Sequence, residues 1–238
     1  MGDVDTLKKA AALAALELIP NNVVVGLGSG STLVYFIQEL GERVRSGQLQ
    51  VVGVPTSFQS HCLAKEAGVP LLDPMSVEKV DITVDGADEI DPAGNLIKGG
   101  GGAHVMEKLV AAMAEQFVVV ADESKPVRVL GTRAAVPVEV ITPALAFVMQ
   151  KVRALGGQPK IRSGNGKLGP VMSDLGHPIL DVKFDAITDA VQLDQQLNAI
   201  PGIVGHGLFV GMANQAIIAR APREKPVIET RALKRTAV

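Results

Sequence analysis

Four short segments of the 238-residue chain gather residues that can bind an anion or move a proton. The first, 26–32 (GLGSGST), interleaves three glycines with three hydroxyl residues. Glycines let backbone N–H groups approach a ligand closely, and the N-terminus of a following helix favours an anion. The segment matches neither a Walker A loop nor a dinucleotide fingerprint, so we interpret it as a phosphate or small-anion site, with a purely structural turn as the alternative. The residues expected at the anion are Gly28, Ser29, Gly30, Ser31 and Thr32.

The second segment, 85–91 (DGADEID), holds four acids in seven residues. It follows a predicted buried strand, at the sheet edge where open α/β folds bind ligands. Carboxylates this close disfavour each other's ionisation, which suits proton transfer. Asp91 begins good turn chemistry, so Asp91 and Glu89 are interpreted as structural, and Asp85 and Asp88 as the chemical pair. A solvated turn and a divalent-metal site are the alternatives, although the spacing differs from an EF-hand.

The third segment, 98–102 (KGGGG), places a lysine before four consecutive glycines. The turn at 91–95 is expected to fold the chain back and bring Lys98 near Asp85 and Asp88. Four glycines lose much conformational entropy on folding, and such a run is easier to explain if its backbone contacts a ligand.

Three further residues accompany these segments. Glu107 lies early in the helix that follows the glycines, where it can point into the same site or be a surface carboxylate. His104 is expected to pack or to form a hydrogen bond at the start of that helix. In the fourth segment, 122–125 (DESK), Lys125 follows a strand and can supply a point charge to a phosphate, an exposed loop lysine being the alternative.

Alternating strand and helix patterns must position these segments. Near-continuous apolar strands between amphipathic helices indicate a parallel sheet covered on both faces. The predicted strands are 21–27, 49–54, 69–72, 80–84, 117–121 and 216–219, and the predicted helices 6–18, 33–44, 57–67 and 103–115.

The pattern changes after about residue 131. Strands at 136–141, 160–163, 178–184 and 203–210, with helices at 143–155 and 189–199, give the order β-α-β-β-α-β of the split βαβ motif. We therefore predict an inserted α+β domain at 132–205 and a main domain formed by 1–131 plus 206–238.

The composition argues against several classes of protein. Seven aromatic residues and a net charge of −2 do not suit a nucleic-acid-binding surface, and no apolar run is long enough for a membrane span. One cysteine, Cys62, excludes an internal disulfide framework and fits a reducing cytoplasm. His61, His177 and His206 are scattered without metal-ligand spacing, so no metal is expected.

Together the segments resemble ribose-5-phosphate isomerases of type A. The similarity spans nearly the whole chain in the right order, and DGADEI followed by KGGGG and a helical glutamate is its specific part. The matching stretches are the N-terminal helix with Lys8 and Lys9, GLGSGST (26–32), VDGADEI (84–90), IKGGGGA (97–103) with Glu107 following, ADESK (121–125), PVEVI (137–141), the pair Gly156 and Gly157, and AIPGIV (199–204).

The resemblance implies interconversion of D-ribose 5-phosphate and D-ribulose 5-phosphate, a step of the pentose phosphate pathway, without metal or organic cofactor. It also implies a Rossmann-like main domain, a ferredoxin-like second domain, and a cytoplasmic homodimer or dimer of dimers. By matching position, Glu107 is the general base, while Asp85, Asp88 and Lys98 aid ring opening and steady the enediolate. The implied substrate contacts are Lys8, Ser31, Thr32 and Lys125 at the phosphate, together with Gly28, Ser29, Gly30, Gly99, Gly100 and Gly101.

The sequence also allows two other interpretations of the function. A CoA-transferase-like enzyme or a sugar-phosphate deaminase can share the glycine loop, but neither explains Lys98 with four glycines. A non-enzymatic sugar-phosphate-sensing domain would belong with a helix-turn-helix module, and only about twenty residues precede the first predicted strand.

Overall fold

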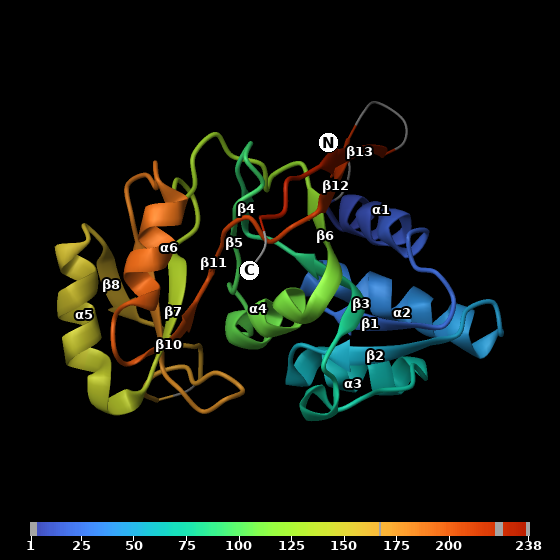
Figure 1. Cartoon of the computed structure of the whole chain (residues 1–238), viewed down its shortest axis with the longest axis horizontal. Helices are drawn as coiled ribbons and strands as arrows, with labels where there is room; N and C mark the ends of the chain where they lie inside the picture. Colours follow the sequence, from blue (N-terminus) through green and yellow to red (C-terminus); the bar gives the residue numbers. More distant parts are fainter. Residues whose placement is uncertain (1–3, 167, 222–225, 237–238) are drawn as a thin grey trace. The chain divides into compact units, whose positions relative to one another are not determined.

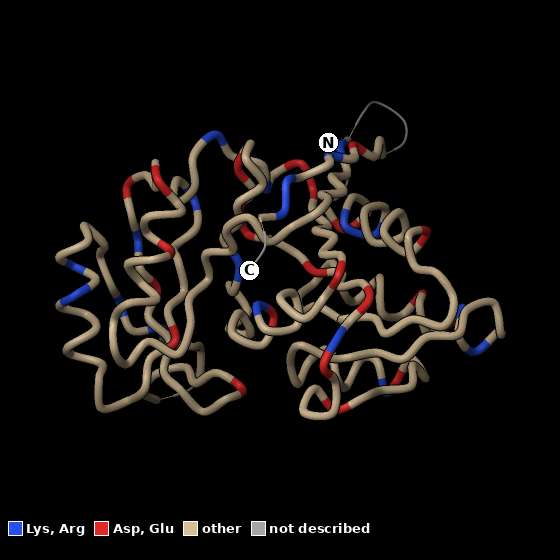
Figure 2. The backbone as a smooth tube through the Cα atoms, in the orientation of Figure 1, with Lys and Arg blue, Asp and Glu red and all other residues tan. Residues whose placement is uncertain are grey.

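The computed structural model describes residues 4–166, 168–221 and 226–236, and their contacts divide the chain into two compact units. The first unit comprises Met1–Ala87, Met106–Lys125 and Gly211–Val238, and the second comprises Asp88–Val105 and Pro126–Val210. Acidic and basic positions are interspersed along the backbone rather than gathered in one segment (Figure 2). None of the helices in the described ranges is long and apolar enough to cross a bilayer.

The first unit is built on a six-stranded sheet in the order β13-β12-β6-β3-β1-β2 (Figure 1). All neighbouring pairs are parallel except β12 with β13, so the predicted parallel sheet is confirmed with one antiparallel edge. The strands are β1 (Val23–Leu27), β2 (Val51–Pro55), β3 (Val80–Gly86), β6 (Ala114–Asp122), β12 (Gln215–Arg220) and β13 (Val227–Ala232).

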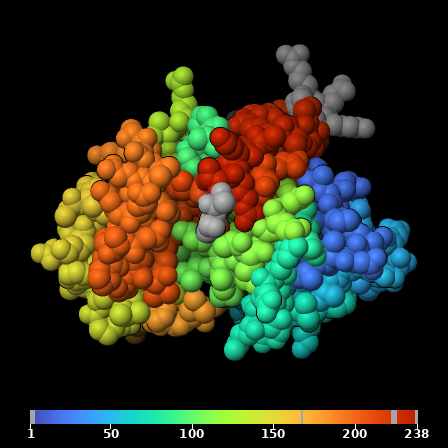
Figure 3. Space-filling model, in the orientation of Figure 1, coloured from blue at the N-terminus to red at the C-terminus, as the bar shows by residue number. Residues whose placement is uncertain are grey.

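Helices cover both faces of this sheet, as near-continuous burial of its central strands requires. Val25 and Leu27 of β1 share one core with α1 and α2, whereas Gly26 faces Val110 of α4 on the other side. The N-terminal helix α1, blue in Figure 3, also contacts β12 and β13, which lie at the red end of the colour scale. The helices are α1 (Val4–Leu16), α2 (Ser31–Arg45), α3 (Phe58–Ala67), α4 (His104–Met113) and the 3₁₀ turn η1 (Pro74–Ser76).

One strand predicted for this unit is absent from the described residues. The stretch 69–72 makes a single parallel bridge, Gly53 to Leu71, rather than a strand. Pro70 has no N–H to donate, and the chain turns into η1 at Pro74, so pairing with β2 stops there. The helix predicted at 103–115 also ends earlier, at Met113, because β6 already begins at Ala114.

The second unit contains a four-stranded antiparallel sheet in the order β10-β7-β9-β8. In chain order these strands are fourth, first, third and second, so the predicted ferredoxin-like βαββαβ arrangement is confirmed. Its apolar face packs against α5 and α6. The elements are β7 (Val136–Val140), η2 (Thr142–Ala144), α5 (Leu145–Ala154), β8 (Gln158–Ile161), β9 (Ile179–Lys183), α6 (Ala190–Asn198) and β10 (Ile203–His206).

A small three-stranded sheet, which the sequence did not predict, also lies in the second unit. It joins β4 (Glu89–Ile90), β5 (Leu96–Ile97) and β11 (Leu208–Phe209). Ile97 enters the core beneath the four-stranded sheet, and this draws Asp88–Val105 into the unit. The compact unit is therefore larger than the range 132–205, whose status as a separate domain stays a prediction. The strand predicted at 203–210 is interrupted at Gly207, where a Cβ would lie 2.1 Å from the Lys98 carbonyl oxygen.

Arg235, beyond β13, caps the C-terminus of α4 in the first unit. Its Nη1 donates to the carbonyl oxygens of Ala114 (2.6 Å) and Glu115 (3.1 Å), and its Nη2 donates to that of Ala111 (3.3 Å). The last carbonyls of a helix lack partners within the helix and carry partial negative charge, so a guanidinium there stabilises the helix end.

Glu139 of β7 is a buried acid in the second unit, with 1% of its surface exposed. Burial raises the pKa of its carboxyl above the usual range, and the nearby Asp174 acts in the same direction. The Ser173 hydrogen bond and the charge of His177 oppose the shift only in part. Since the folded state then holds its proton at a pH where the unfolded chain releases it, Glu139 lowers the free energy of unfolding as pH rises through this interval.

We predict that Glu139→Gln, which cannot ionise, removes this pH-dependent cost. The Tm of the variant relative to that of the parent protein should rise between pH 4 and pH 8, by about 2–4 °C for each kcal/mol of unfolding free energy recovered. Thermal unfolding followed by circular dichroism at several pH values measures it. A difference in Tm that stays constant with pH would contradict the assignment.

Candidate functional site

The glycine turn that follows β1 lies at the topological switch point of the six-stranded sheet. The chain leaves β1 for β2 on one side and returns to β3 on the other. Gly28 N–H donates to the Val84 carbonyl oxygen (3.0 Å), and Ser29 N–H donates to Asp85 Oδ1 (3.1 Å). Ligands of open α/β sheets bind outside the carboxyl ends of the strands at this point, so the first two predicted segments meet where a site is expected.

Asp85 occupies the space that a side chain at position 28 would need. A Cβ built on Gly28 would lie 2.3 Å from Asp85 Cγ and Oδ1 and 2.6 Å from the Val84 carbonyl oxygen. Asp85 is 1% exposed, and its carboxyl group also accepts the N–H of Gly86 (2.7 Å). Its orientation is therefore fixed by packing and by backbone donors.

Side chains after β2 hold the glycine turn, and the sequence did not identify them as part of the site. Ser29 Oγ lies 2.9 Å from Thr56 Oγ1 and 2.5 Å from Ser57 Oγ, while Gly30 N–H donates to Gln59 Oε1 (2.9 Å). Ser57 is also the N-cap of α3. Adjacent parallel strands end at the same edge, so the pairing of β1 with β2 was the signal that could have revealed them.

The N-terminus of α2 has the features of an anion site. Gly30 has φ 100°, and within the described chain no side chain caps this helix end. Ser31 and Thr32 lie in the first turn, exposed and half-buried respectively. The N–H groups and hydroxyls of such a turn, with the helix dipole, favour negative charge.

Glu107 lies on α4, one turn before Val110. A Cβ on Gly26 would lie 2.7 Å from Val110 Cγ1, so this face of α4 packs over β1. Residues three apart share a helix face, and the Glu107 side chain is accordingly buried, with 5% exposed. It does not face bulk solvent. The helix ends beside the start of β3, where Ala114 pairs with Val80, so Glu107 in its first turns lies nearer the carboxyl ends of the strands.

The two lysines predicted to contact phosphate are partly buried in the first unit. Lys8 of α1 pairs with Asp5, with 3.4 Å between Nζ and Oδ1. Lys125 follows β6, where its N–H donates to the Asp122 carbonyl oxygen (3.2 Å) and Ser124 binds the buried Asp122 carboxylate. Their contact with substrate stays a prediction.

In the second unit, the β4–β5 hairpin brings Asp88 and Lys98 to neighbouring positions. Asp88 N–H donates to the Ile97 carbonyl oxygen (2.8 Å), which confirms that the turn at 91–95 folds Lys98 back toward Asp88. Lys98 is 3% exposed, and its Nζ lies 5.4 Å from the centre of the Phe209 ring. Asp88 Oδ2 accepts the N–H of Gly100 (2.9 Å).

The two acids interpreted as structural have that role. Glu89 is fully buried and accepts the N–H groups of Gly131, Arg133 and Ala134 at 2.6–2.7 Å. Asp91 accepts the N–H of Asn95 (2.8 Å) and closes the hairpin turn. Both predictions are confirmed.

His104 and the metal-site alternative were also raised by the sequence. His104 is fully buried at the start of α4, and a Cβ on Gly99 would lie 2.6 Å from its Cβ, so it packs there as predicted. Among residues 4–166, 168–221 and 226–236, no three His, Cys, Asp or Glu side chains form a group that could hold a metal ion.

A glycine turn at the switch point of a parallel sheet, with a buried carboxyl group at the end of the next strand, is typical of α/β proteins that bind small anionic ligands. The profile of the family described as Ribose 5-phosphate isomerase A (phosphoriboisomerase A) matches residues 52–222. The chain belongs to this family, and the resemblance found in the motifs is confirmed.

Individual relatives agree over nearly the whole chain. Ribose-5-phosphate isomerase A of Thermosynechococcus vestitus is 50% identical over 226 residues, 94% of this chain and 96% of the relative. The structure of ribose 5-phosphate isomerase A from Methanocaldococcus jannaschii has a TM-score of 0.90 and 40% identity, covering 97% of this chain and 100% of that one. A D-ribose-5-phosphate isomerase in complex with phospho-erythronic acid has a TM-score of 0.91 and 40% identity, covering 96% and 100%.

The family and these relatives carry the name of ribose 5-phosphate isomerases. The isomerase class predicted for this chain is therefore confirmed. Membership favours it over the CoA-transferase-like, deaminase and sensing-domain alternatives.

We predict that Gly28→Ala lowers kcat/KM by about 10²-fold, because the added methyl group must displace the Asp85 carboxyl, and misplacement by about 1 Å can cost that much. Gly86→Ala is the matched control, since a Cβ there makes only ordinary contacts, the nearest at 3.7 Å to Leu33. Steady-state kinetics on both variants, with thermal unfolding to verify the fold, measures the effect. Equal activity of the two would contradict the role of this contact.

Proposed function

We propose that this chain interconverts D-ribose 5-phosphate and D-ribulose 5-phosphate by moving a proton between C2 and C1 through a cis-enediolate, with Glu107 as the base. The observation that carries the proposal is the burial of Glu107, which is 5% exposed on the face of α4 that packs over β1. A positioned base contributes typically about 10²–10⁴-fold to such a step.

The phosphate of the substrate binds at the N-terminus of α2. Backbone N–H groups of the glycine turn and the hydroxyls of Ser31 and Thr32 contact it, and Lys8 and Lys125 add positive charge. The Ser29 hydroxyl, bonded to Thr56 and Ser57, supports the shape of the turn. The negatively charged phosphate thus anchors the substrate while the other end reacts.

Ring opening and charge stabilisation come from the acids and the glycine segment. Asp88 assists ring opening, and Glu107 then takes the proton from C2 as the C2 electron pair forms the C1=C2 bond. Lys98, a protonated Asp85 and the N–H groups of Gly99, Gly100 and Gly101 stabilise the charge on the oxygens, and the O2 proton moves to O1 through these groups. Glu107 returns its proton to C1, so no net proton or electron is consumed. One such donor contributes roughly 3–4 kcal/mol.

The reaction so assigned needs no metal or organic cofactor, because every proton transfer has a side chain to perform it. The proposal includes a homodimer, or a dimer of dimers, in the cytoplasm. The family resemblance supports the assembly, and the single cysteine fits the compartment.

We predict that Glu107→Gln lowers kcat by at least about 10²-fold and leaves KM within a few-fold, because the amide has the same shape but cannot accept the C2 proton. Release of isotope from ribose 5-phosphate labelled at C2 measures the step directly. Unchanged kcat, or isotope release at the parent rate, would remove Glu107 from this role.

We predict that Lys125→Ala mainly raises KM, by about 10-fold. The positive charge that Lys125 places near the phosphate stabilises the bound substrate and the transition state equally, so its loss weakens both to the same extent. Lys65→Ala is the control, since Lys65 is exposed in the last turn of α3. Initial rates over a range of ribose 5-phosphate concentrations separate the constants. A fall in kcat alone would show that Lys125 does not bind the phosphate.

A further inference from the structure

The glycine segment Gly99–Gly102 has no side chains with which to hold its own conformation. Gly99 and Gly102 have φ values of 98° and 84°, in the left-handed region that glycine adopts readily. The turn is closed by Gly102 N–H donating to the Gly99 carbonyl oxygen (2.9 Å). Because glycine peptides reorient easily, other groups must fix the direction of these N–H and C=O groups.

Arg162, just after β8, supplies that restraint from within the second unit. Its Nη1 donates to the carbonyl oxygens of Gly99 (3.1 Å) and Gly100 (3.2 Å). Its own backbone is held on both sides, since its N–H donates to the Ile179 carbonyl oxygen and its carbonyl oxygen accepts from Val171 N–H, both at 2.8 Å. With 13% of its side chain exposed, the guanidinium is largely shielded from water.

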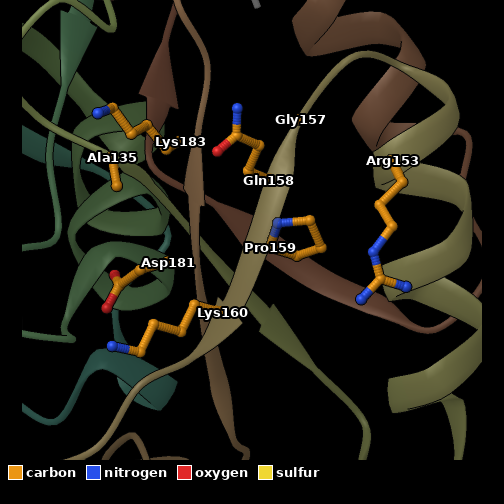
Figure 4. Close-up of a pocket in the computed structure, with 8 residues that line it drawn as sticks. All are labelled: Ala135, Arg153, Gly157, Gln158, Pro159, Lys160, Asp181 and Lys183. Carbon is orange, nitrogen blue, oxygen red and sulfur yellow. The ribbon is translucent and has the colours of Figure 1, made fainter.

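Asp181 of β9 fixes the guanidinium in turn. Arg162 Nε donates to both carboxylate oxygens (3.1 and 3.0 Å), and Nη2 donates to Oδ1 (2.5 Å). A fork of this kind sets the plane of the guanidinium and leaves Nη1 directed at the carbonyls. Asp181 lies beside Lys160 in an open groove of about 510 Å³, whose other wall includes Arg153 of α5 (Figure 4).

The peptide group between Gly99 and Gly100 is also held on its N–H side. The Gly99 carbonyl and the Gly100 N–H belong to one peptide unit, and that N–H donates to Asp88 Oδ2 (2.9 Å). Arg162 therefore binds the oxygen and Asp88 the hydrogen of a single amide plane. Such a chain of hydrogen bonds is mutually strengthening, and rotation of the peptide would break both contacts.

We propose that Arg162, held by Asp181, is a positioning residue for the isomerisation: it orients the Gly99–Gly100 peptide and, through it, the Asp88 carboxylate. This inference rests on the proposed function, which assigns Asp88 to ring opening. Arg162 itself touches no reacting atom in this assignment. It acts by keeping the glycine N–H groups and Asp88 aimed in one direction.

The test is steady-state kinetics of Arg162→Lys, Arg162→Met and Asp181→Asn with ribose 5-phosphate, on protein whose folded fraction is measured by circular dichroism. A lysine keeps the charge but cannot bind Asp181 and two carbonyls as a fork. We expect kcat to fall about 10- to 10²-fold in the Arg162 variants, less in Asp181→Asn, with KM changed less than about 3-fold. Arg153→Met, at an exposed arginine of the same groove, should keep the parent kcat.

A double-mutant cycle separates positioning from a merely structural role. If Arg162 acts through Asp88, then Asp88→Asn combined with Arg162→Met should lower kcat little further than Asp88→Asn alone. Should Arg162→Met not fold, the same cycle is run with Arg162→Lys.

Two results would overturn the inference: kcat per folded molecule within 2-fold of the parent in the Arg162 variants, or losses that multiply in the double variant. If Asp88→Asn itself kept the parent kcat, the proposed role of Asp88 would fail instead. If Asp88→Asn lost activity while the Arg162 variants kept the parent kcat, only the positioning role of Arg162 would be contradicted.

Discussion

The close approach of β1 and β3 at their carboxyl ends is the contact on which the rest of the site depends. Gly28 has no side chain, and the Asp85 carboxyl fills the space beside it. Two hydrogen bonds, from Gly28 N–H to Val84 and from Ser29 N–H to Asp85, tie the glycine turn to the following strand. The anion-binding turn and a buried acid are thereby set side by side before any substrate arrives, which is what pre-organised catalysis requires.

Buried charge imposes the second constraint. An ionised group taken out of water needs hydrogen-bond partners or an opposite charge, and the second unit supplies both. Glu89 accepts three backbone N–H groups, and Arg162 is matched by Asp181 and two glycine carbonyls. Hydrogen bonds that support one another in this way can hold a conformationally free segment, such as four consecutive glycines, in a single conformation.

The sequence predicted those features whose causes are local. The turn at 91–95 and the βαββαβ order follow from neighbouring residues and hydrophobic patterns, and both are present. It missed features that depend on partners distant in the sequence, namely the three-stranded sheet and the support of the glycine turn by Gln59. It also missed Arg162, which binds Gly99 and Gly100 across 63 and 62 positions of sequence. At 69–72 the sequence instead predicted a strand that is not formed. The run is apolar, as a strand would be, but Pro70 has no N–H to donate, and the segment makes only one bridge to its neighbour.

The segment that follows β13 also stabilises the end of α4. Arg235 binds the carbonyl oxygen of Ala111 in the last turn of the helix that carries Glu107, and those of Ala114 and Glu115 directly after that helix, so it holds the C-terminal end of α4 in place. Loss of the Arg235 guanidinium would leave every proposed catalytic group intact and would still let the end of this helix fray. The contacts of Arg235 are therefore a condition for a well-ordered α4 and for the position of Glu107 on it.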